Sequence, residues 1–343
     1  MTKKKRERKE RQARQAKLDP TDSTKRRQPE EVPELSALSD PRAMERMSAN
    51  MGRLLEEQQF DSIEQAQAFI NQMLSEGGGF LPEAPAPTTP LEKAQDLVYE
   101  AFETESARKR IQLAKRALKT SGDCADAYVL LAEEDAGSLE EAKELYQKGV
   151  EAGERALGEE TFEEEAGHFW GILETRPYMR ARQGLAVCLW ELGEREEAID
   201  HYQQMLDLNP GDNQGIRYEL AGCLLDEEMD EELGELLERY EEDASALWVY
   251  TRALWAFRKE GDTEEATAAL KEAIETNPYV PLYLLGHKNL PSALPNLMGF
   301  GDESEAVAYF ARALTGWLRT PSALEWLRGN VDERLLVELQ EDE

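Results

Sequence analysis

The most chemically distinctive residues of this chain are three arginines at the predicted start of a helix. Arg176, Arg180 and Arg182 fall within seven residues of one another, and Pro177 suits the first turn of a helix. Guanidinium groups bind carboxylates and phosphates through paired hydrogen bonds, so the cluster is a candidate anion patch. The same arginines would also neutralise the acids of segment 163–174, and we favour this structural role.

Catalysis finds little support in the remaining residues. The chain has only 3 histidines. His168 shares a helix face with Glu164, but two groups do not hold a metal without a third ligand. His201 is expected to be exposed on a helix, and His287 lies in a predicted turn. We therefore expect no catalytic residue, no metal and no cofactor, and an enzyme that uses the 159–182 insertion is kept as an alternative.

The arginines and histidines lie in a helix-turn-helix pattern that occurs more than once. The first clear copy places apolar, small, Gly and Pro residues at fixed offsets: Leu185, Ala186, Leu189, Gly193, Ala198, Tyr202, Met205 and Pro210. A later copy has the same offsets: Ala253, Leu254, Phe257, Gly261, Ala266, Leu270, Ala273 and Pro278. A period of about 34 residues with these positions is typical of the tetratricopeptide repeat.

One small residue early in each second helix traces the repeat along the chain. These residues are Ala142, Ala198, Leu233, Ala266 and Ala306. Their spacings are 56, 35, 33 and 40 residues, so the first step carries an insertion and the last a shorter one. The pattern predicts an all-α fold, a tetratricopeptide-type right-handed helical solenoid of about five to six helix pairs, with an N-terminal helical hairpin and a disordered basic arm.

Composition divides the chain into five segments. Residues 1–40 form a charged and Pro-punctuated arm, expected to be disordered because it has few apolar residues to bury. Residues 41–76 have apolar residues at helical spacing and predict the hairpin, and 77–90 is a Gly/Pro linker. Residues 91–330 form the repeat domain, and 331–343 are an acidic tail.

Two local features refine this division. Asp61 and Glu64 predict a capping box at the start of the second hairpin helix. Segment 277–281 holds Pro278 and Pro281, so we expect an extended or turn connection there and not a regular helix.

The charge of the chain is large and unevenly distributed. The net charge is −31, yet residues 1–27 hold 12 Lys/Arg and 4 Asp/Glu, a local charge of +8, which leaves −39 on the rest. An acidic body repels nucleic-acid phosphates, so the repeat domain is a poor candidate for binding RNA or DNA. Such a charge is consistent with attraction of basic partners, but glutamate-rich outer faces of a helical solenoid are the commoner reason for it.

The N-terminal arm carries the second candidate function, a ribosome- or RNA-associated factor tethered by its basic run. That run is Lys3, Lys4, Lys5, Arg6, Arg8 and Lys9. The alternative is a solvated tail, or one that folds back on the acidic body. Three scattered cysteines and the lack of a long apolar run indicate a reducing, cytoplasmic setting without a membrane segment.

The leading functional hypothesis is a non-enzymatic scaffold or adaptor that binds a peptide or protein in the concave groove of the solenoid. By analogy with the repeat, its groove would be lined by Arg180, Gln183, Trp190, Tyr218, Trp248, Trp255 and Arg258. Arg and Trp are strong anchors in protein interfaces. The three tryptophans at helical spacing are equally consistent with packing between helices.

The C-terminal third resembles a known family. The segments that carry the resemblance are Asn277–Leu285, Lys288–Pro291, Gly301–Tyr309 and Trp317–Leu327. They are similar to the suppressor-of-tumorigenicity family, and the resemblance implies a helical-repeat interaction protein with a special connection before its last helix pair. That family is membrane-anchored in animals, and since this chain has no such apolar segments, we do not expect its location or partners to carry over.

Overall fold

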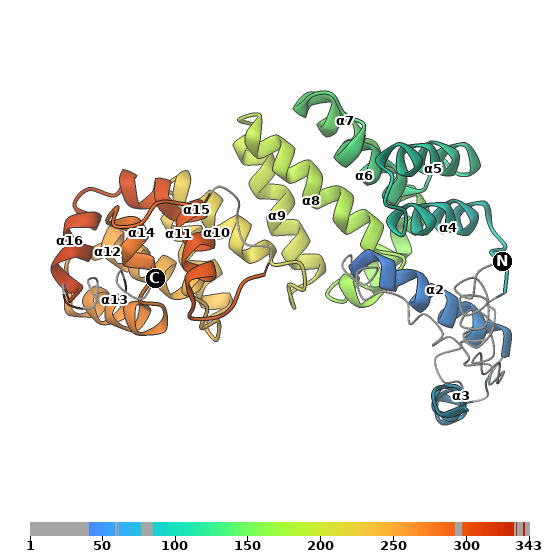
Figure 1. The fold of residues 1–343 in the computed structure, drawn as a ribbon, viewed down its shortest axis with the longest axis horizontal. Coiled ribbons are helices and arrows are strands. Elements are labelled where there is room, and N and C mark those ends of the chain that lie inside the picture. The colour runs from blue at the N-terminus through green and yellow to red at the C-terminus, as the bar shows by residue number, and fades with distance from the viewer. Residues whose placement is uncertain are drawn as a thin grey trace, which may run out of the picture. The chain divides into compact units, whose positions relative to one another are not determined.

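The computed structural model describes residues 41–58, 60, 62–76, 85–291, 297–332, 334 and 339. Within these residues every regular element is a helix (Figure 1). The chain divides into two units, residues 1–41 and 42–343, and the helical array belongs to the second. The predicted arm 1–40, most of the linker 77–90 and most of the tail 331–343 lie outside the described residues.

Five helix pairs follow one another from Pro90 to Thr276. They are α4 (Pro90–Phe102) with α5 (Ala107–Thr120), α6 (Ala125–Glu134) with α7 (Leu139–Glu164), α8 (Arg176–Glu191) with α9 (Arg195–Leu208), α10 (Ile216–Asp226) with α11 (Asp230–Arg239), and α12 (Ala246–Glu260) with α13 (Glu264–Thr276). The last three second helices begin 35 and 34 residues apart. The prediction of an all-α repeat fold is therefore confirmed.

Four of the five residues that trace the repeat are fully buried, and the fifth, Ala142, is partly buried. The four are Ala198, Leu233, Ala266 and Ala306. Several helices begin at a side-chain cap, as at Thr89, Ser138, Thr263 and Asp302. Such a cap satisfies an amide that the first helical turn leaves without a partner.

The long first step of the repeat comes from an extended second helix. Helix α7 has 26 residues and bends at Gly158, whose φ is 72°. A short 3₁₀ helix, Phe169–Gly171, follows it. Phe162, Phe169 and Tyr178 pack ring against ring and attach the insertion to α8. The 159–182 insertion thus extends the hydrophobic core.

The end of the array departs from the repeat. After α13 the chain forms α14 (Val280–Leu284), α15 (Glu303–Arg319) and α16 (Ala323–Asn330). The expectation that 277–281 avoids regular helix is correct for residues 277–279 but wrong for Val280 and Pro281, because a proline in the first turn has no amide to satisfy. Helix α15 then packs against α10 and α12, which are first helices of their pairs.

Two helices precede the array, α2 (Pro41–Gln58) and α3 (Ile63–Glu76). Asp61, the predicted cap of the second, lies outside the described residues, and Ser62 accepts the Gln65 amide at 3.4 Å there. Most described side chains of α3 are exposed. Helix α2 makes long-range contacts with α4, α6 and α8, and these contacts define the candidate site.

Candidate functional site

Helix α2 is held to the array by ion pairs from one stripe of its surface. Arg42 and Arg46 are four residues apart, and Arg53 follows seven residues later. These steps are about one and two helical turns, so the three arginines lie on one side of the helix. Arg42 pairs with Glu133 of α6 at 2.9 Å and Arg53 with Asp96 of α4 at 3.1 Å. Arg46 pairs at 2.6 Å with Glu103, the residue that follows α4.

At Glu45, in the same stripe, the charges are exchanged: the acid lies on α2 and its arginine partners lie on α8. Glu45 is 5% exposed and accepts two hydrogen bonds from the guanidinium of Arg180, at 2.9 and 3.0 Å. Arg176 adds a third contact at 3.3 Å. We call the charged array residues that meet α2, together with Asp126 behind Arg180, the α2-binding face: Asp96, Glu103, Asp126, Glu133, Arg176 and Arg180.

Arg180 is held from its other side by a buried carboxylate. Asp126 on α6 is fully buried and receives hydrogen bonds from Arg180 at 2.9 and 2.7 Å and from Gln95 at 2.8 Å. Burial alone favours a neutral guanidine, but Asp126 and Glu45 outweigh it and raise the pKa of Arg180. The guanidinium therefore stays charged and bridges two carboxylates, one from the array and one from α2.

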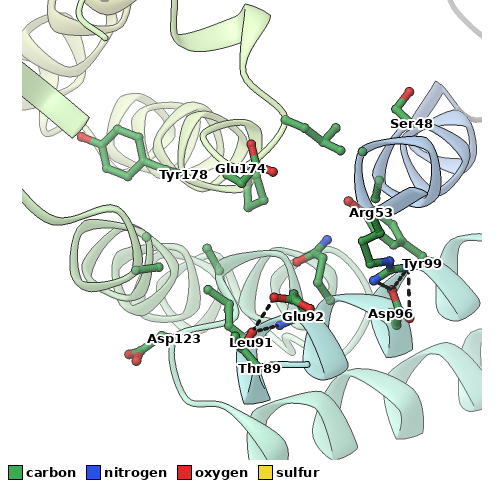
Figure 2. A pocket seen from close by; sticks show the side chains of 18 of the residues that line it. Ser48, Arg53, Thr89, Leu91, Glu92, Asp96, Tyr99, Asp123, Glu174 and Tyr178 are labelled. Carbon is green, nitrogen blue, oxygen red and sulfur yellow. Dashed lines mark hydrogen bonds and ion pairs between the residues drawn. The ribbon is translucent and has the colours of Figure 1, made fainter. Parts of the chain in front are cut away.

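A cleft of about 430 Å³ opens beside α2. Figure 2 shows Ser48 and Arg53 of α2 on one side of it, with Leu91, Glu92 and Asp96 of α4 below. Five carboxylates and a single arginine line it: Glu56, Glu92, Asp96, Asp123, Glu174 and Arg53. Apolar surface comes from residues such as Leu91, Leu173 and Tyr178.

Two side chains of the cleft respond to this environment. Tyr99 is 4% exposed, and burial, with Asp126 and Glu45 nearby, raises the pKa of its hydroxyl. The Thr88 amide donates to Glu92 at 2.7 Å and lowers the pKa of that carboxyl. Tyr99 therefore stays a neutral phenol and Glu92 an anion, so the cleft is acidic near neutral pH.

Three predicted groove residues lie on α8, and each already contacts another part of the chain. Arg180 binds Glu45 and Asp126, as described. The Gln183 side-chain oxygen accepts a hydrogen bond from Gln214 at 2.9 Å. Trp190 is half-buried beneath the guanidinium of Arg195, which lies 3.8 Å from its ring centre.

The other four predicted groove residues do not form an open surface. Trp248 is fully buried between Tyr218 and Tyr240, so it belongs to the core, and its predicted place in the groove is corrected. The indole of Trp255 donates to the Asp230 carbonyl at 2.7 Å. Arg258 donates to the Leu225 carbonyl at 2.9 Å. Both side chains hold α12 against its neighbours.

Helix α15 explains why this part of the array is closed. Arg312 pairs with Glu219 of α10 at 2.6 Å. A Cβ on Gly222 of α10 would lie 3.0 Å from Arg312, and one on Gly316 of α15 would lie 3.3 Å from Leu225. The space left between Tyr218, Thr251 and α15 is only about 10 Å³.

The predicted anion patch is divided between two environments. Arg176 and Arg180 meet at Glu45. Arg182 lies elsewhere, donating to the Tyr178 hydroxyl at 2.7 Å and to His201 at 3.1 Å. The expectation that acids of segment 163–174 neutralise the arginines is corrected, because Arg176 and Arg180 form their ion pairs with Glu45 and Asp126.

The remaining sequence candidates lie outside this face. The basic run from Lys3 to Lys9 falls outside the described residues. In the described part of the chain no group of three or more His, Cys, Asp or Glu side chains is arranged to hold a metal ion. His201, expected to be exposed, is partly buried against Arg182.

Two central residues of the face escaped the sequence analysis, Glu45 and Asp126. Signals for both are present in the sequence. Asp126 is an acid within the mostly apolar stretch from Ala125 to Ala132. The spacing of Arg42, Glu45, Arg46 and Arg53 marks a charged stripe on a helix whose apolar spacing alone had been used to predict it.

The array matches a family of known proteins over most of its length. The model of the ST7 protein family matches residues 86–336. Suppressor of tumorigenicity 7 protein-like from Rattus norvegicus is 30% identical over 260 residues, covering 69% of this chain and 46% of the relative. Suppressor of tumorigenicity 7 protein from Macaca fascicularis is 30% identical, covering 67% of this chain and 48% of the relative. The chain spans about half the length of the curated relatives it matches.

A solved structure also shows similarity. The crystal structure of YrrB, described as a TPR protein with an unusual peptide-binding site, has a TM-score of 0.39 and 21% identity, covering 61% of this chain and 91% of that chain. None of the helices in the described part of the chain combines the length and apolar composition needed to cross a bilayer. The resemblance predicted for the C-terminal third extends from α4 to beyond α16, and the chain belongs to the ST7 protein family.

Proposed function

We propose that this chain is a non-enzymatic interaction scaffold that binds a protein segment at the face of α4, α6 and α8. The observation that carries the proposal is the cleft beside α2, which combines five carboxylates with apolar surface in about 430 Å³. The partner segment carries lysine or arginine, because a cationic head group meets the carboxylates while its methylene stem lies on the apolar wall.

The charge of the chain supports the same class of partner. The net charge is −31, and the basic residues are concentrated before residue 28. An acidic surface steers basic segments toward it and increases their association rate, an effect that salt screens. The partner should therefore bind more slowly at high ionic strength.

The contacts of α2 support the proposal from inside the molecule. Three arginines of α2 pair with acids of the α2-binding face, at distances from 2.6 to 3.1 Å. The face is thus complementary to arginines presented at helical spacing. A second protein segment of this chemistry finds matching acids on the same helices.

The test is selection of binding peptides from a random library displayed on phage, with the full chain immobilised. We expect the selected peptides to be enriched in Lys and Arg. Glu56 and Glu174 are exposed at the cleft, so Glu56→Lys with Glu174→Lys should weaken a selected peptide at least about tenfold, because two attractive charges become repulsive.

A matched control separates the cleft from the net charge. Glu260→Lys with Glu275→Lys makes the same change in charge at exposed C-terminal helix ends, where a cation is tolerated. This control should keep the peptide affinity within about twofold, since exposed charges far from the ligand are screened. Equal weakening by the two pairs, or selection of acidic or purely apolar peptides, would refute the proposal.

A further inference from the structure

Helix α2 is attached to the array mainly through charged side chains. Met44 and Met47 are 49% and 50% exposed, so a large part of the apolar surface of the helix faces away from the array. Leu54, at 5% exposed, is its main buried apolar side chain. The pairs of Arg42 and Arg46 lie at partly exposed positions, where an ion pair adds little to stability. Outside the Glu45 contact, α2 is therefore held largely by polar pairs, of which Arg53 with Asp96 is the most buried.

The contact at Glu45 is different because it is buried and specific. Arg180 receives its carboxylate through two parallel hydrogen bonds and Arg176 adds a third. Arg180 is also paired with Asp126, a residue of the array, through two further hydrogen bonds. The array therefore holds a preformed carboxylate-binding site that does not depend on α2 for its own structure.

We propose that α2 is an exchangeable internal ligand of the α2-binding face, and that the partner is a helix that repeats its charged stripe. Such a helix carries an arginine, a carboxylate three residues later, a second arginine at the next position and a third about two turns further on, as Arg42, Glu45, Arg46 and Arg53 do. The proposal rests on the proposed function, in which the ligand is a protein segment. It places that segment in the position of α2, beside the cleft acids that the array itself supplies, and adds its charged pattern and the competition that regulates its binding.

Competition follows from the shared chemistry. Asp96, Glu103 and Glu133 are already paired with α2, so a partner helix reaches them only when α2 leaves. Because α2 is part of the same chain, its effective concentration at the face is high compared with that of a separate partner. The free face is therefore a minor state, and the apparent affinity for a partner is reduced by its small population.

The experiment uses the full chain and a fluorescein-labelled peptide of residues 41–58 as the probe. Glu45→Arg in the protein places a third cation beside Arg176 and Arg180 and should release α2. We expect this variant to bind the peptide at least about tenfold more tightly than the unmodified chain, because the internal competitor is removed. Glu57→Arg is the matched control: it makes the same substitution on an exposed residue of α2 and should leave the affinity unchanged.

A second peptide distinguishes specific recognition of Glu45 from non-specific electrostatic binding of the peptide to the acidic chain. Glu45→Gln in the peptide makes the peptide more basic, so non-specific binding to the acidic chain would become stronger. Recognition by Arg176 and Arg180 predicts the opposite, a loss of at least about fivefold, because the charge-assisted hydrogen bonds are lost. Arg176→Gln in the released protein should weaken the native peptide and affect the Glu45→Gln peptide much less.

Hydrogen exchange supplies a readout that needs no ligand. The amides of α2 should exchange faster in the Glu45→Arg protein than in the Glu57→Arg protein, while those of α8 stay protected. Equal exchange in α2, or equal peptide affinity for the two proteins, would overturn the internal-ligand proposal. If α2 is released and binds in trans but the library yields no basic peptide, the proposed function and the partner helix both fail, and only the role of α2 as an internal ligand of the face stands.

Discussion

The ring of Tyr146 on α7 lies directly against Gly184 on α8, so close that a methyl group on the glycine would overlap the ring. Gly184 is in the middle of its helix, where glycine is intrinsically unfavourable. The same pair of helices also approaches at Gly149, where an added Cβ would lie 3.0 Å from Ala181. Close packing of α7 on α8 therefore outweighs helix propensity at this crossing.

Gly184→Ala should lower the free energy of unfolding by about 1–3 kcal/mol, because the added methyl group forces apart two packed helices. Urea denaturation followed by circular dichroism measures the change. Tyr146→Ala should remove most of this penalty when it is combined with Gly184→Ala, since the space is then free. Stabilisation by Gly184→Ala alone would show that the helices are not in such close contact.

Arg180→Met should destabilise the chain by about 3–5 kcal/mol, because it leaves the buried carboxylate of Asp126 without its cation and Glu45 with Arg176 alone. Asp126→Leu added to Arg180→Met should recover part of the loss, since the uncompensated charge on α6 is removed. Denaturant unfolding of the single and double variants measures both effects.

The control for this prediction is an Arg–Asp pair at the surface. Arg155 pairs with Asp123 at 2.8 Å, with side chains 54% and 46% exposed. Arg155→Met should cost less than about 1 kcal/mol, because water screens the pair. A loss at Arg155 as large as that at Arg180 would mean that burial does not set the strength of these contacts.

The sequence allowed the repeat to be predicted, because one small residue per helix pair marks each helix crossing. Ala198 and Ala266, chosen by their spacing, are fully buried. The residues that line the groove were predicted less well, and the reason is physical. Within one helix, residues that face the core and residues that face the groove have the same helical period. Trp248 was therefore assigned to the groove, although it is buried between two tyrosines.

The packing of α2 and α15 on the repeat helices could not be predicted from local periodicity. Glu45 reaches Arg180 across 135 residues, and Arg312 reaches Glu219 across 93. Such contacts depend on where α2 and α15 pack in three dimensions, and the repeat pattern carries no information about either. The arginines of α8 were recognised as anion binders from their type, but the identity of their anion required the fold.

The unfolding free energy should fall as the pH is lowered from about 6.5 to 5, with a contribution from His201. Burial, with Arg182 nearby, lowers the pKa of His201 to about 4. The unfolded chain, with an ordinary histidine pKa near 6.5, therefore binds a proton before the folded chain does. Above both values the histidine is neutral in the two states and contributes no pH dependence.

His201→Gln should make this pH dependence shallower, because glutamine does not titrate and its side-chain oxygen still accepts from Arg182. Thermal unfolding at pH 7 and pH 5 compares the two proteins. The imidazole signal that disappears in the variant should titrate near pH 4 in the unmodified chain. An unchanged slope would show that His201 does not contribute to it.

Glu305→Ala should cost about 2–4 kcal/mol, because several buried amide donors would lose their acceptor. Glu305 on α15 is fully buried and accepts from the amides of Ala246 and Gly301, both at 2.8 Å, and from the Asn277 side chain at 3.0 Å. It therefore caps the start of α12 from 59 residues away. This contact gives a structural reason for the asparagine in the Asn277-Pro278 segment.

Asn277→Ala should be destabilising by itself but add much less than its full effect to Glu305→Ala, since the two side chains share one network. A double-mutant cycle by urea denaturation should give a coupling of about 0.5–3 kcal/mol. Asn330 donates to the Trp326 carbonyl at 2.9 Å, outside this network, so Asn330→Ala should be additive with Glu305→Ala. If Asn277→Ala were equally additive, Glu305 and Asn277 would not act as one unit in joining α15 to the array.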